Sequence, residues 1–281
     1  MLRSLWTAKT GLDAQQTSLD TISNNLANVS TTAYKRVRPI FEDLLYQNLR
    51  SPGLVEDSSG TFLPAGLQAG NGSRISATQR INSAGSLIQS QNPLDMAING
   101  NGFFAVAVPN GAGSYDVAYT RAGNFMRNSD GKIVTPGGHI VLSDAELPGA
   151  GTSTIANPTG ITIPSEATAV VVGTDGSVTY YGVSTTKPFL AGRIGISNFS
   201  NPAGLATGGS GLYFETASSG NAINGVASQN GFGSISQYYT EQSNVNVAEE
   251  LVSLIAAQRA YEITAKSVSA SDQILQKLGQ L

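Results

Sequence analysis

Side chains that could carry out chemistry are few in this chain and are scattered along it. His139 is the only histidine, and no Gly-x-Ser-x-Gly turn accompanies it that could supply a serine nucleophile. Asp130 and Asp175 each precede a glycine, which is typical of hairpin turns and not of a catalytic pair of carboxylates. Because catalysis needs a positioned nucleophile or a general acid and base, we expect no catalytic residue and no enzymatic activity.

The glycine-rich stretches lack the surroundings of a phosphate-binding loop. Gly100-Asn101-Gly102-Phe103 leads into a strand-like run, and Gly208-Gly209-Ser210-Gly211 lacks both the flanking pattern and the lysine. The chain contains no cysteine, which excludes thiolate catalysis, disulfides and cysteine-ligated metals, and metal-ligand spacing is missing elsewhere. We therefore expect no cofactor, no metal and no small-molecule substrate.

The composition predicts a weakly charged surface. The 281 residues are enough for one or two domains with a sizeable core. Charged residues make up only 12%, about half of the usual share, and the net charge is −3. Such a surface suits dense packing against neighbouring molecules, because each unpaired charge buried there would be costly. It offers no basic field, so we expect no nucleic-acid partner.

No targeting signal or membrane span is visible in the sequence. Residues 1–30 lack an unbroken apolar region, since Gln15 and Asn24 are among the polar residues that interrupt it. The longest apolar runs, Phe103 to Val108 and Ala167 to Val172, are far shorter than the roughly 20 residues that a spanning helix needs. If the protein leaves the cytoplasm, we expect a route that removes no signal peptide.

The elements that remain to be explained are the two ends of the chain, which are apolar at the same seven-residue interval. Such a heptad pattern keeps one face of a helix turned toward a partner helix. The N-terminal rows, which we predict to be buried, are Leu5, Leu12, Leu19 and Leu26, with Ile22 and Val29. The C-terminal rows are Val247, Leu254, Tyr261, Val268 and Leu275, with Leu251 and Ile255.

The second of these helices has a clear start. Asn246 is a good N-cap, and Glu249 lies three residues later, where it can reach back to free backbone N–H groups. The pattern indicates a seam without specifying whose helix fills it: the two helices can form a hairpin within one chain or pair between copies. Because isolated helices are marginal in water, we expect both ends to be frayed in the isolated subunit.

Between the helices the sequence predicts strands. Asn71-Gly72, Asn110-Gly111, Asp130-Gly131 and Asp175-Gly176 are two-residue hairpin turns. Their spacing favours a meandering antiparallel domain. The predicted fold is therefore α+β, with long coiled-coil-like helices at both ends of an antiparallel, mostly-β domain. We expect residues 1–33 and 240–281 to form one helical assembly domain, 34–70 a connecting segment and 71–239 the β-rich domain.

Several stretches resemble the signatures of the bacterial flagellar rod and hook axial protein family, and together they cover nearly the whole chain. Ala33 departs from the pattern, because it stands where the family commonly has glycine, so we expect a slightly different backbone there. The stretches that carry the resemblance are Ile22 to Thr32 with Tyr34-Lys35, Asn99 to Phe104, Tyr119 to Phe125, and Ser243 to Val252 with Gln258 to Glu262.

Within the family, the chain is most similar to members that form the distal part of the rod, since hook members usually carry an additional outer domain. The similarity includes a rod-specific stretch at about 46–64, which we expect to bridge adjacent subunits. The residues singled out in that stretch are Tyr46, Arg50, Pro52, Phe62 and Pro64.

The resemblance implies a structural subunit that polymerises into a rigid, hollow helical shaft and transmits motor torque to the hook. It implies copies of the same chain, proximal rod and hook subunits, the peptidoglycan- and outer-membrane-ring proteins, the export apparatus and the rod cap as partners. It also implies a place in the periplasm-spanning rod of the basal body. The alternatives are a proximal rod or hook subunit and, in another class, a monomeric extracellular β-protein that binds glycans.

Overall fold

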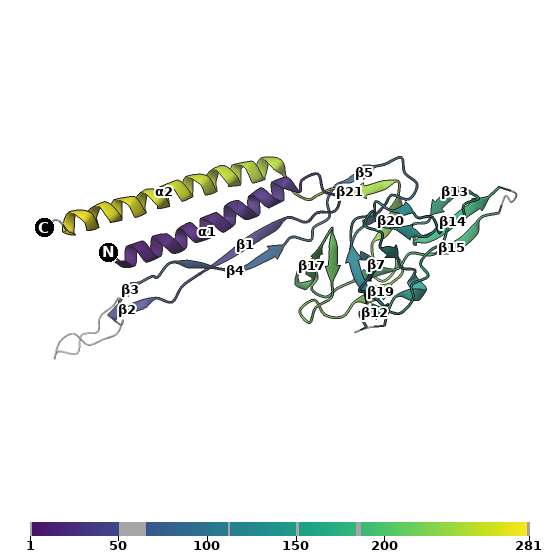
Figure 1. Ribbon diagram of the computed structural model, residues 1–281, viewed down its shortest axis with the longest axis horizontal. Coiled ribbons are helices and arrows are strands. Elements are labelled where there is room, and N and C mark those ends of the chain that lie inside the picture. Colours follow the sequence, from purple (N-terminus) through teal and green to yellow (C-terminus); the bar gives the residue numbers. More distant parts are fainter. Residues whose placement is uncertain (1, 51–65, 112, 150–151, 184–186, 280–281) are drawn as a thin grey trace. The chain divides into compact units, whose positions relative to one another are not determined.

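The computed structural model describes residues 2–50, 66–111, 113–149, 152–183 and 187–279 (Figure 1). They form two compact units, and each unit combines segments that are far apart in sequence. The first unit consists of Met1–Ala27, Val37–Ile81 and Asn246–Leu281, and the second of Asn28–Arg36 and Asn82–Val245.

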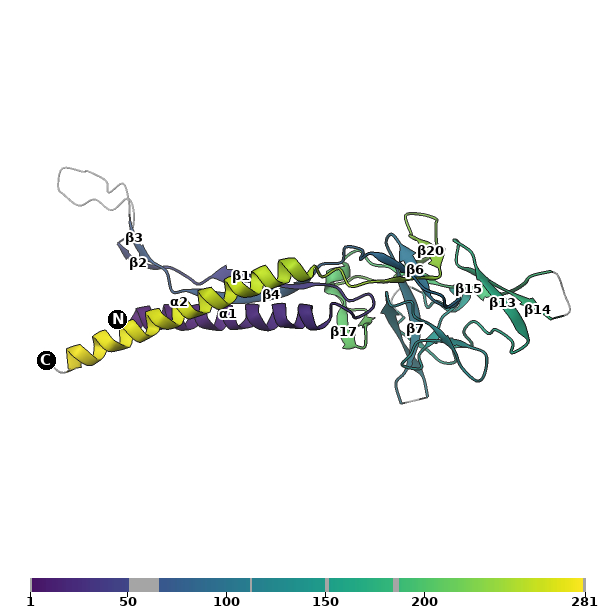
Figure 2. The same cartoon turned by 90° about the horizontal axis from the view of Figure 1, so that it is seen from above.

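The first unit contains one helix from each end of the chain, α1 (Leu2–Ala27) and α2 (Val247–Gly279). They lie side by side in Figures 1 and 2. The α+β class and the helix at each end are confirmed. Both helices are formed in the single chain, and each buries part of one face against the other. The expectation that both ends are frayed in the isolated subunit stays a prediction. No helix among the described residues is long and apolar enough to cross a membrane.

An antiparallel ribbon of β1 (Val37–Asp43) and β4 (Ser73–Arg80) completes the first unit, and α1 contacts both strands. Beyond the ribbon, β2 (Gln47–Arg50) pairs with β3 (Leu67–Ala69). The prediction of a hairpin at Asn71-Gly72 is therefore wrong, although Gly72 has a φ of 102°. The strands that flank this turn pair with earlier strands instead of with each other.

The second unit is built around the hairpin of β7 (Phe103–Pro109) and β8 (Tyr115–Thr120), as Asn110-Gly111 predicts. The largest sheet has the strand order β17-β18-β8-β7-β11-β10-β9, with β12 beside β8, and with β16 joining β7 to β19. Its other strands are β9 (Met126–Arg127), β10 (Ile133–Val134), β11 (Ile140–Val141), β12 (Thr154–Ile155), β16 (Ile196–Asn198), β17 (Ala206–Gly209), β18 (Leu212–Phe214) and β19 (Ile223–Gly225). Two short 3₁₀ helices, η1 (Asp144–Glu146) and η2 (Pro202–Gly204), lie in its connections.

Three smaller sheets complete the second unit, and the hairpin turns at Asp130-Gly131 and Asp175-Gly176 are confirmed by pairing of β9 with β10 and of β13 with β14. One small sheet has the order β13-β14-β15, and the other two pair β20 with β6 and β21 with β5. Their bounds are β5 (Leu87–Gln89), β6 (Met96–Asn99), β13 (Ala167–Val172), β14 (Ser177–Gly182), β15 (Phe189–Arg193), β20 (Ser234–Gln237) and β21 (Tyr239–Glu241).

Both faces of strand β7 are buried, which explains its uninterrupted apolar sequence. Phe104 and Val106 belong to one hydrophobic cluster, together with Phe125. Phe103 and Ala105 belong to a second cluster on the other face of the strand. Because successive side chains of a strand point to opposite faces, the two clusters sandwich the hairpin. The hairpin is thus a rigid centre from which the second unit positions its polar residues.

Candidate functional site

The paired helices α1 and α2 run antiparallel within the first unit. Gly11 of α1 lies beside Thr264 of α2, since a Cβ placed on Gly11 would lie 3.6 Å from the Thr264 side chain, an ordinary van der Waals distance. Toward the other end of α1, the amide of Asn25 donates to the carboxylate of Glu250 across 3.4 Å. These two contacts fix the register of the pair, with the start of α2 beside the end of α1.

The predicted N-terminal rows face the interior of this unit only in part. Ile22 is buried, whereas Leu5, Leu12, Leu19 and Leu26 are half-buried. Val29 is half-buried and lies just beyond the last residue of α1.

The predicted C-terminal rows are divided between two faces of α2. Leu254 and Val268 are half-buried, and Leu275 lies within α2 but its side chain is outside the described residues. The remaining four predicted residues are exposed. Their exposed fractions are 41% for Val247, 42% for Leu251, 50% for Ile255 and 39% for Tyr261.

The side of α2 that packs within the chain combines the half-buried Leu254 and Val268 with small and polar residues. Ala257 and Glu250 are its buried residues. The apolar side chains of Val252 and Ile263, each 68% exposed, extend the exposed face that Leu251 and Ile255 begin. We call these four residues the apolar face of α2. Several large apolar side chains exposed on one helix in this way are typical of an interaction surface.

The start of α2 is capped by Asn246. Its Oδ1 accepts a hydrogen bond of 3.1 Å from the backbone N–H of Ala248, which satisfies one of the free donors of the first turn. Glu249 is exposed in the same turn, where its negative charge interacts favourably with the positive end of the helix dipole.

Asn25 forms a buried polar clamp that the heptad analysis does not identify. Its side chain is 1% exposed, and it pairs with the backbone of Val37, donating to the carbonyl at 2.8 Å and accepting from the N–H at 3.0 Å. Together with its bond to Glu250, this side chain connects α1, β1 and α2. A buried asparagine pairs in this way only where the register is correct, so the clamp specifies one arrangement.

A second buried cluster lies in the second unit and joins two cations to one carboxylate. Lys35 Nζ lies 2.6 Å from Glu241 Oε1, and Arg121 Nε lies 3.1 Å from Glu241 Oε2. The three side chains are between 1% and 5% exposed. Burial lowers the pKa of Lys35 despite the attraction of Glu241, and the nearby charge of Arg121 lowers it further.

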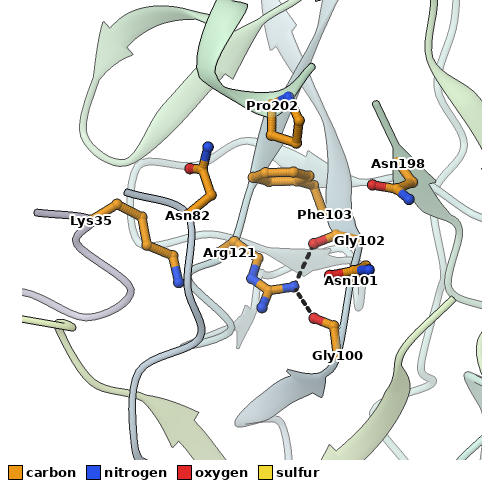
Figure 3. Close-up of a pocket in the computed structure, with 9 residues that line it drawn as sticks. All are labelled: Lys35, Asn82, Gly100, Asn101, Gly102, Phe103, Arg121, Asn198 and Pro202. Atoms are coloured by element: carbon orange, nitrogen blue, oxygen red, sulfur yellow. Dashed lines mark hydrogen bonds between the residues drawn. The ribbon is translucent and has the colours of Figure 1, made fainter. Parts of the chain in front are cut away.

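Backbone groups complete the bonding of these ions. Arg121 Nη1 donates to the carbonyls of Gly100 and Gly102 at 2.8 and 2.6 Å, as Figure 3 shows. Lys35 Nζ also donates to the carbonyl of Ser83 at 2.7 Å, and Glu241 Oε1 accepts from the N–H of Gly85 at 2.8 Å. The cluster therefore holds together the start, the middle and the end of the second unit.

Neither the Asn25 clamp nor the ion cluster around Glu241 can be identified from catalytic or metal-binding motifs in the sequence. Lys35 and Arg121 lie inside family-like stretches but carry no pattern of their own, and Glu241 precedes the C-terminal stretch. The only available signal is that charged residues are scarce and that two of them, Lys35 and Arg121, interrupt otherwise uncharged motifs.

Ala33 has a φ of 57° and is only 5% exposed. This is the left-handed region that glycine favours, so alanine keeps at this position the backbone that glycine would adopt. Its N–H donates to the carbonyl of Glu241 at 2.8 Å, which holds the conformation in place.

The stretch at 46–64 lies largely outside the described residues. Tyr46 is 55% exposed, and Arg50 is the last residue of β2. Pro52, Phe62 and Pro64 lie outside the described residues.

No catalytic or metal-binding arrangement appears among the described residues. His139 is half-buried, and its backbone N–H donates a hydrogen bond to Thr135 Oγ1, as expected for a residue of a turn. Asp175 Oδ1 accepts from the N–H and hydroxyl of Ser177, and these bonds lower its pKa. No group of three metal-ligating side chains occurs within the described ranges.

Comparison with known proteins gives three family matches along the chain. Residues 5–35 match the "Flagella basal body rod protein" family, residues 97–180 the "Flagellar hook protein FlgE/F/G D1 domain", and residues 236–281 the "Flagellar basal body rod FlgEFG protein C-terminal" family.

Several relatives that match over nearly their full length are flagellar basal-body rod proteins named FlgG. The flagellar basal-body rod protein FlgG of Buchnera aphidicola subsp. Acyrthosiphon pisum is 46% identical over 281 residues, covering all of both chains. FlgG of Caulobacter vibrioides is 39% identical over 280 residues, covering all of this chain and 99% of the relative. FlgG of Bacillus subtilis is 34% identical over 284 residues, with the same coverage.

Proposed function

The chain belongs to the FlgG family of flagellar basal-body rod proteins and is a structural subunit of the distal rod, and we propose that the apolar face of α2 is the contact through which it polymerises. Members of this family are structural proteins and not enzymes, and they belong to the flagellar basal body. The observation that carries the proposal is the exposure of Leu251, Val252, Ile255 and Ile263 in a helix whose opposite side is already paired.

Burial of that face by a neighbouring copy explains how a shaft forms. Removing one large apolar side chain from water stabilises by roughly 1.5–3 kcal/mol, so several such residues outweigh the cost of ordering a subunit. A head-to-tail contact that does not close on itself repeats without limit and generates a helical filament. In this proposal residues 1–33 and 240–281 form the inner tube with coiled-coil-like packing, and residues 71–239 pack outside it.

The shaft must also resist bending in order to transmit motor torque to the hook. We assign this property to the stretch at about 46–64, which begins where Tyr46 and Leu49 are exposed beside the short β2–β3 pair. In the proposal this stretch bridges adjacent subunits. Deleting it should give curved or flexible polymers in electron micrographs, and straight rods from the deletion variant would overturn the assignment.

The wider context is part of the same proposal. The subunit is exported through the flagellar export apparatus without a cleaved signal peptide and is assembled under a rod cap. In the periplasm it joins proximal rod subunits at one end and hook subunits at the other, inside the peptidoglycan- and outer-membrane-ring proteins. The low charge of the chain, 12% of residues, suits such close packing.

The test is a charge placed on the apolar face of α2. Ile255→Asp removes an exposed apolar side chain without disturbing the pairing of α1 with α2, so the subunit should fold normally and fail to polymerise. Ser267→Asp, at an exposed polar position of the same helix, is the matched control and should polymerise. Sedimentation and electron microscopy measure the outcome, and normal shafts from Ile255→Asp would refute the proposal.

A further inference from the structure

A small pocket lies beside the buried ions of the second unit (Figure 3). Its volume is about 50 Å³, which is room for a few water molecules or one small polar group. Two cations line it, Lys35 and Arg121, together with the amides of three asparagines. The full lining is Lys35, Asn82, Gly100, Asn101, Gly102, Phe103, Arg121, Asn198 and Pro202.

The two cations carry more hydrogen-bond donors than their acceptors use. An ammonium group has three hydrogens, and Lys35 uses two, toward Ser83 and Glu241. A guanidinium has five, and Arg121 uses one on Nε and two on Nη1. One hydrogen of Lys35 and the two on Arg121 Nη2 therefore make no hydrogen bond to any described residue.

The cluster also carries an excess of positive charge. Two cations face the single carboxylate of Glu241, and the remaining acceptors are neutral backbone carbonyls. Buried charge that is incompletely paired is costly, and the lowered pKa of Lys35 reflects that cost. A further negative charge at the pocket would balance the two cations.

The asparagine amides around the pocket are also available. The side chains of Asn82 and Asn101 make no hydrogen bond to a described residue. Asn198 uses only its oxygen, which accepts from the N–H of Phe199 at 2.9 Å. Three asparagine side chains thus line the pocket together with the two cations, a set of donors suited to the several acceptor lone pairs of an oxyanion.

We propose that this pocket binds one small oxyanion, with a single carboxylate group as the ligand class that fits its size and donors. The carboxylate can come from a free ion or from an acidic side chain of a second copy of the chain. Binding is a property of the single chain and is independent of the polymerisation proposed above.

Formate is the probe for the test on the full chain. In ¹H–¹⁵N NMR spectra at constant ionic strength, formate should cause saturable shifts of the side-chain signals of Asn82, Asn101, Asn198 and Arg121. The exposed Asn221, which lies outside the pocket, should not respond. Shifts that are absent, or that are linear and spread over the surface, would mean an adventitious ion only and would overturn the proposal.

Asn82→Asp gives an independent test, because it places a carboxylate in the pocket at nearly unchanged volume. We expect this variant to unfold at a higher temperature than the unmodified protein and to lose the saturable response to formate. Asn221→Asp is the matched control and should keep both properties. A lower unfolding temperature of Asn82→Asp together with an intact formate response would contradict the proposal.

The rate of shaft elongation in the presence of formate distinguishes the two sources of the carboxylate, a free ion and an acidic side chain of a second copy. If an acidic side chain of a second copy enters the pocket, formate competes with it and slows elongation of the unmodified protein in proportion to pocket occupancy. If a free ion is the ligand, elongation proceeds at the same rate with the pocket saturated. Failure of the chain to polymerise would leave the NMR result on the single chain unaffected.

Discussion

Lys35 and Glu241 are 206 positions apart in the chain and form an ion pair of 2.6 Å that is almost completely buried. Glu241 also bonds Arg121, so one carboxylate pairs with two cations from different parts of the second unit. Glu241 lies near the C-terminal end of the second unit, so the ion cluster connects this end of the unit to Lys35 at its start and to Arg121 in its middle.

Replacing Glu241 by Gln should destabilise the second unit strongly. Removing one partner from a buried ion pair leaves uncompensated charge and typically costs roughly 3–5 kcal/mol. Urea unfolding, followed through NMR signals of β7 and β8, measures the change. The exposed pair of Glu42 and Arg74 in the first unit provides the control, since Glu42→Gln should have little effect. Equal stability of the two variants would contradict this role of Glu241.

Replacing Asn25 by Asp should weaken the first unit through two effects. The substitution removes the donor to the carbonyl of Val37, which costs about 1–3 kcal/mol for a buried group, and it places a second carboxylate beside Glu250. The added replacement of Glu250 by Gln should recover part of the loss, because it removes the repulsion. A double-mutant cycle measures this coupling, and purely additive effects would show that Asn25 and Glu250 do not interact.

Ala33→Gly should leave stability nearly unchanged. Relief of the left-handed strain is worth roughly 1–2 kcal/mol. The greater freedom of glycine, about 0.5–1 kcal/mol, and the loss of a buried methyl, about 0.8 kcal/mol, offset that gain. Ala97→Gly, at a fully buried position of β6, is the control and lacks the compensating relief. If both variants lose the same free energy of unfolding, the backbone of Ala33 is not strained.

The stability of the second unit should fall in acid partly through Glu146. Burial raises the pKa of this carboxyl, but hydrogen bonds from Thr159 and Ser143 outweigh burial and lower it below its ordinary value of 4.5. A depressed pKa in the folded state means that the stabilisation is present above about pH 4.5 and is lost as the pH falls through the folded value. Glu146→Gln should flatten this part of the pH profile of unfolding, whereas the exposed Glu166→Gln should not. Parallel profiles for the two variants would refute the assignment.

The parts of the fold that the sequence predicts are those with local causes. The heptad interval, the N-cap at Asn246 and the turn at Asn110-Gly111 each act within a few residues, and they predict α1, α2 and the β7–β8 hairpin. Strands β1 and β2 escape prediction because β1 pairs with β4 and β2 with β3, across the stretch at 51–65. Strands β1 and β4 also contact α1, and no local pattern in the sequence encodes that contact.

The residues of the two polar clusters could not be identified for a related reason. Asn25 looks like an interruption of a heptad, and Lys35 like an ordinary surface lysine. Their partners include Glu250 and Glu241, which lie more than two hundred positions away. Similarly, the heptad rows predict that a seam exists, but only the paired helices reveal that Leu251 and Ile255 remain exposed.

The central claim, that a neighbouring copy covers the apolar face of α2, is tested most directly by thiol labelling. The chain has no cysteine, so Ile255→Cys and Ser267→Cys each introduce a single reactive site. Maleimide should modify both variants rapidly as single chains. In assembled shafts the account predicts that labelling of I255C falls at least tenfold while labelling of S267C is little changed. Equal labelling of I255C before and after assembly would contradict the account.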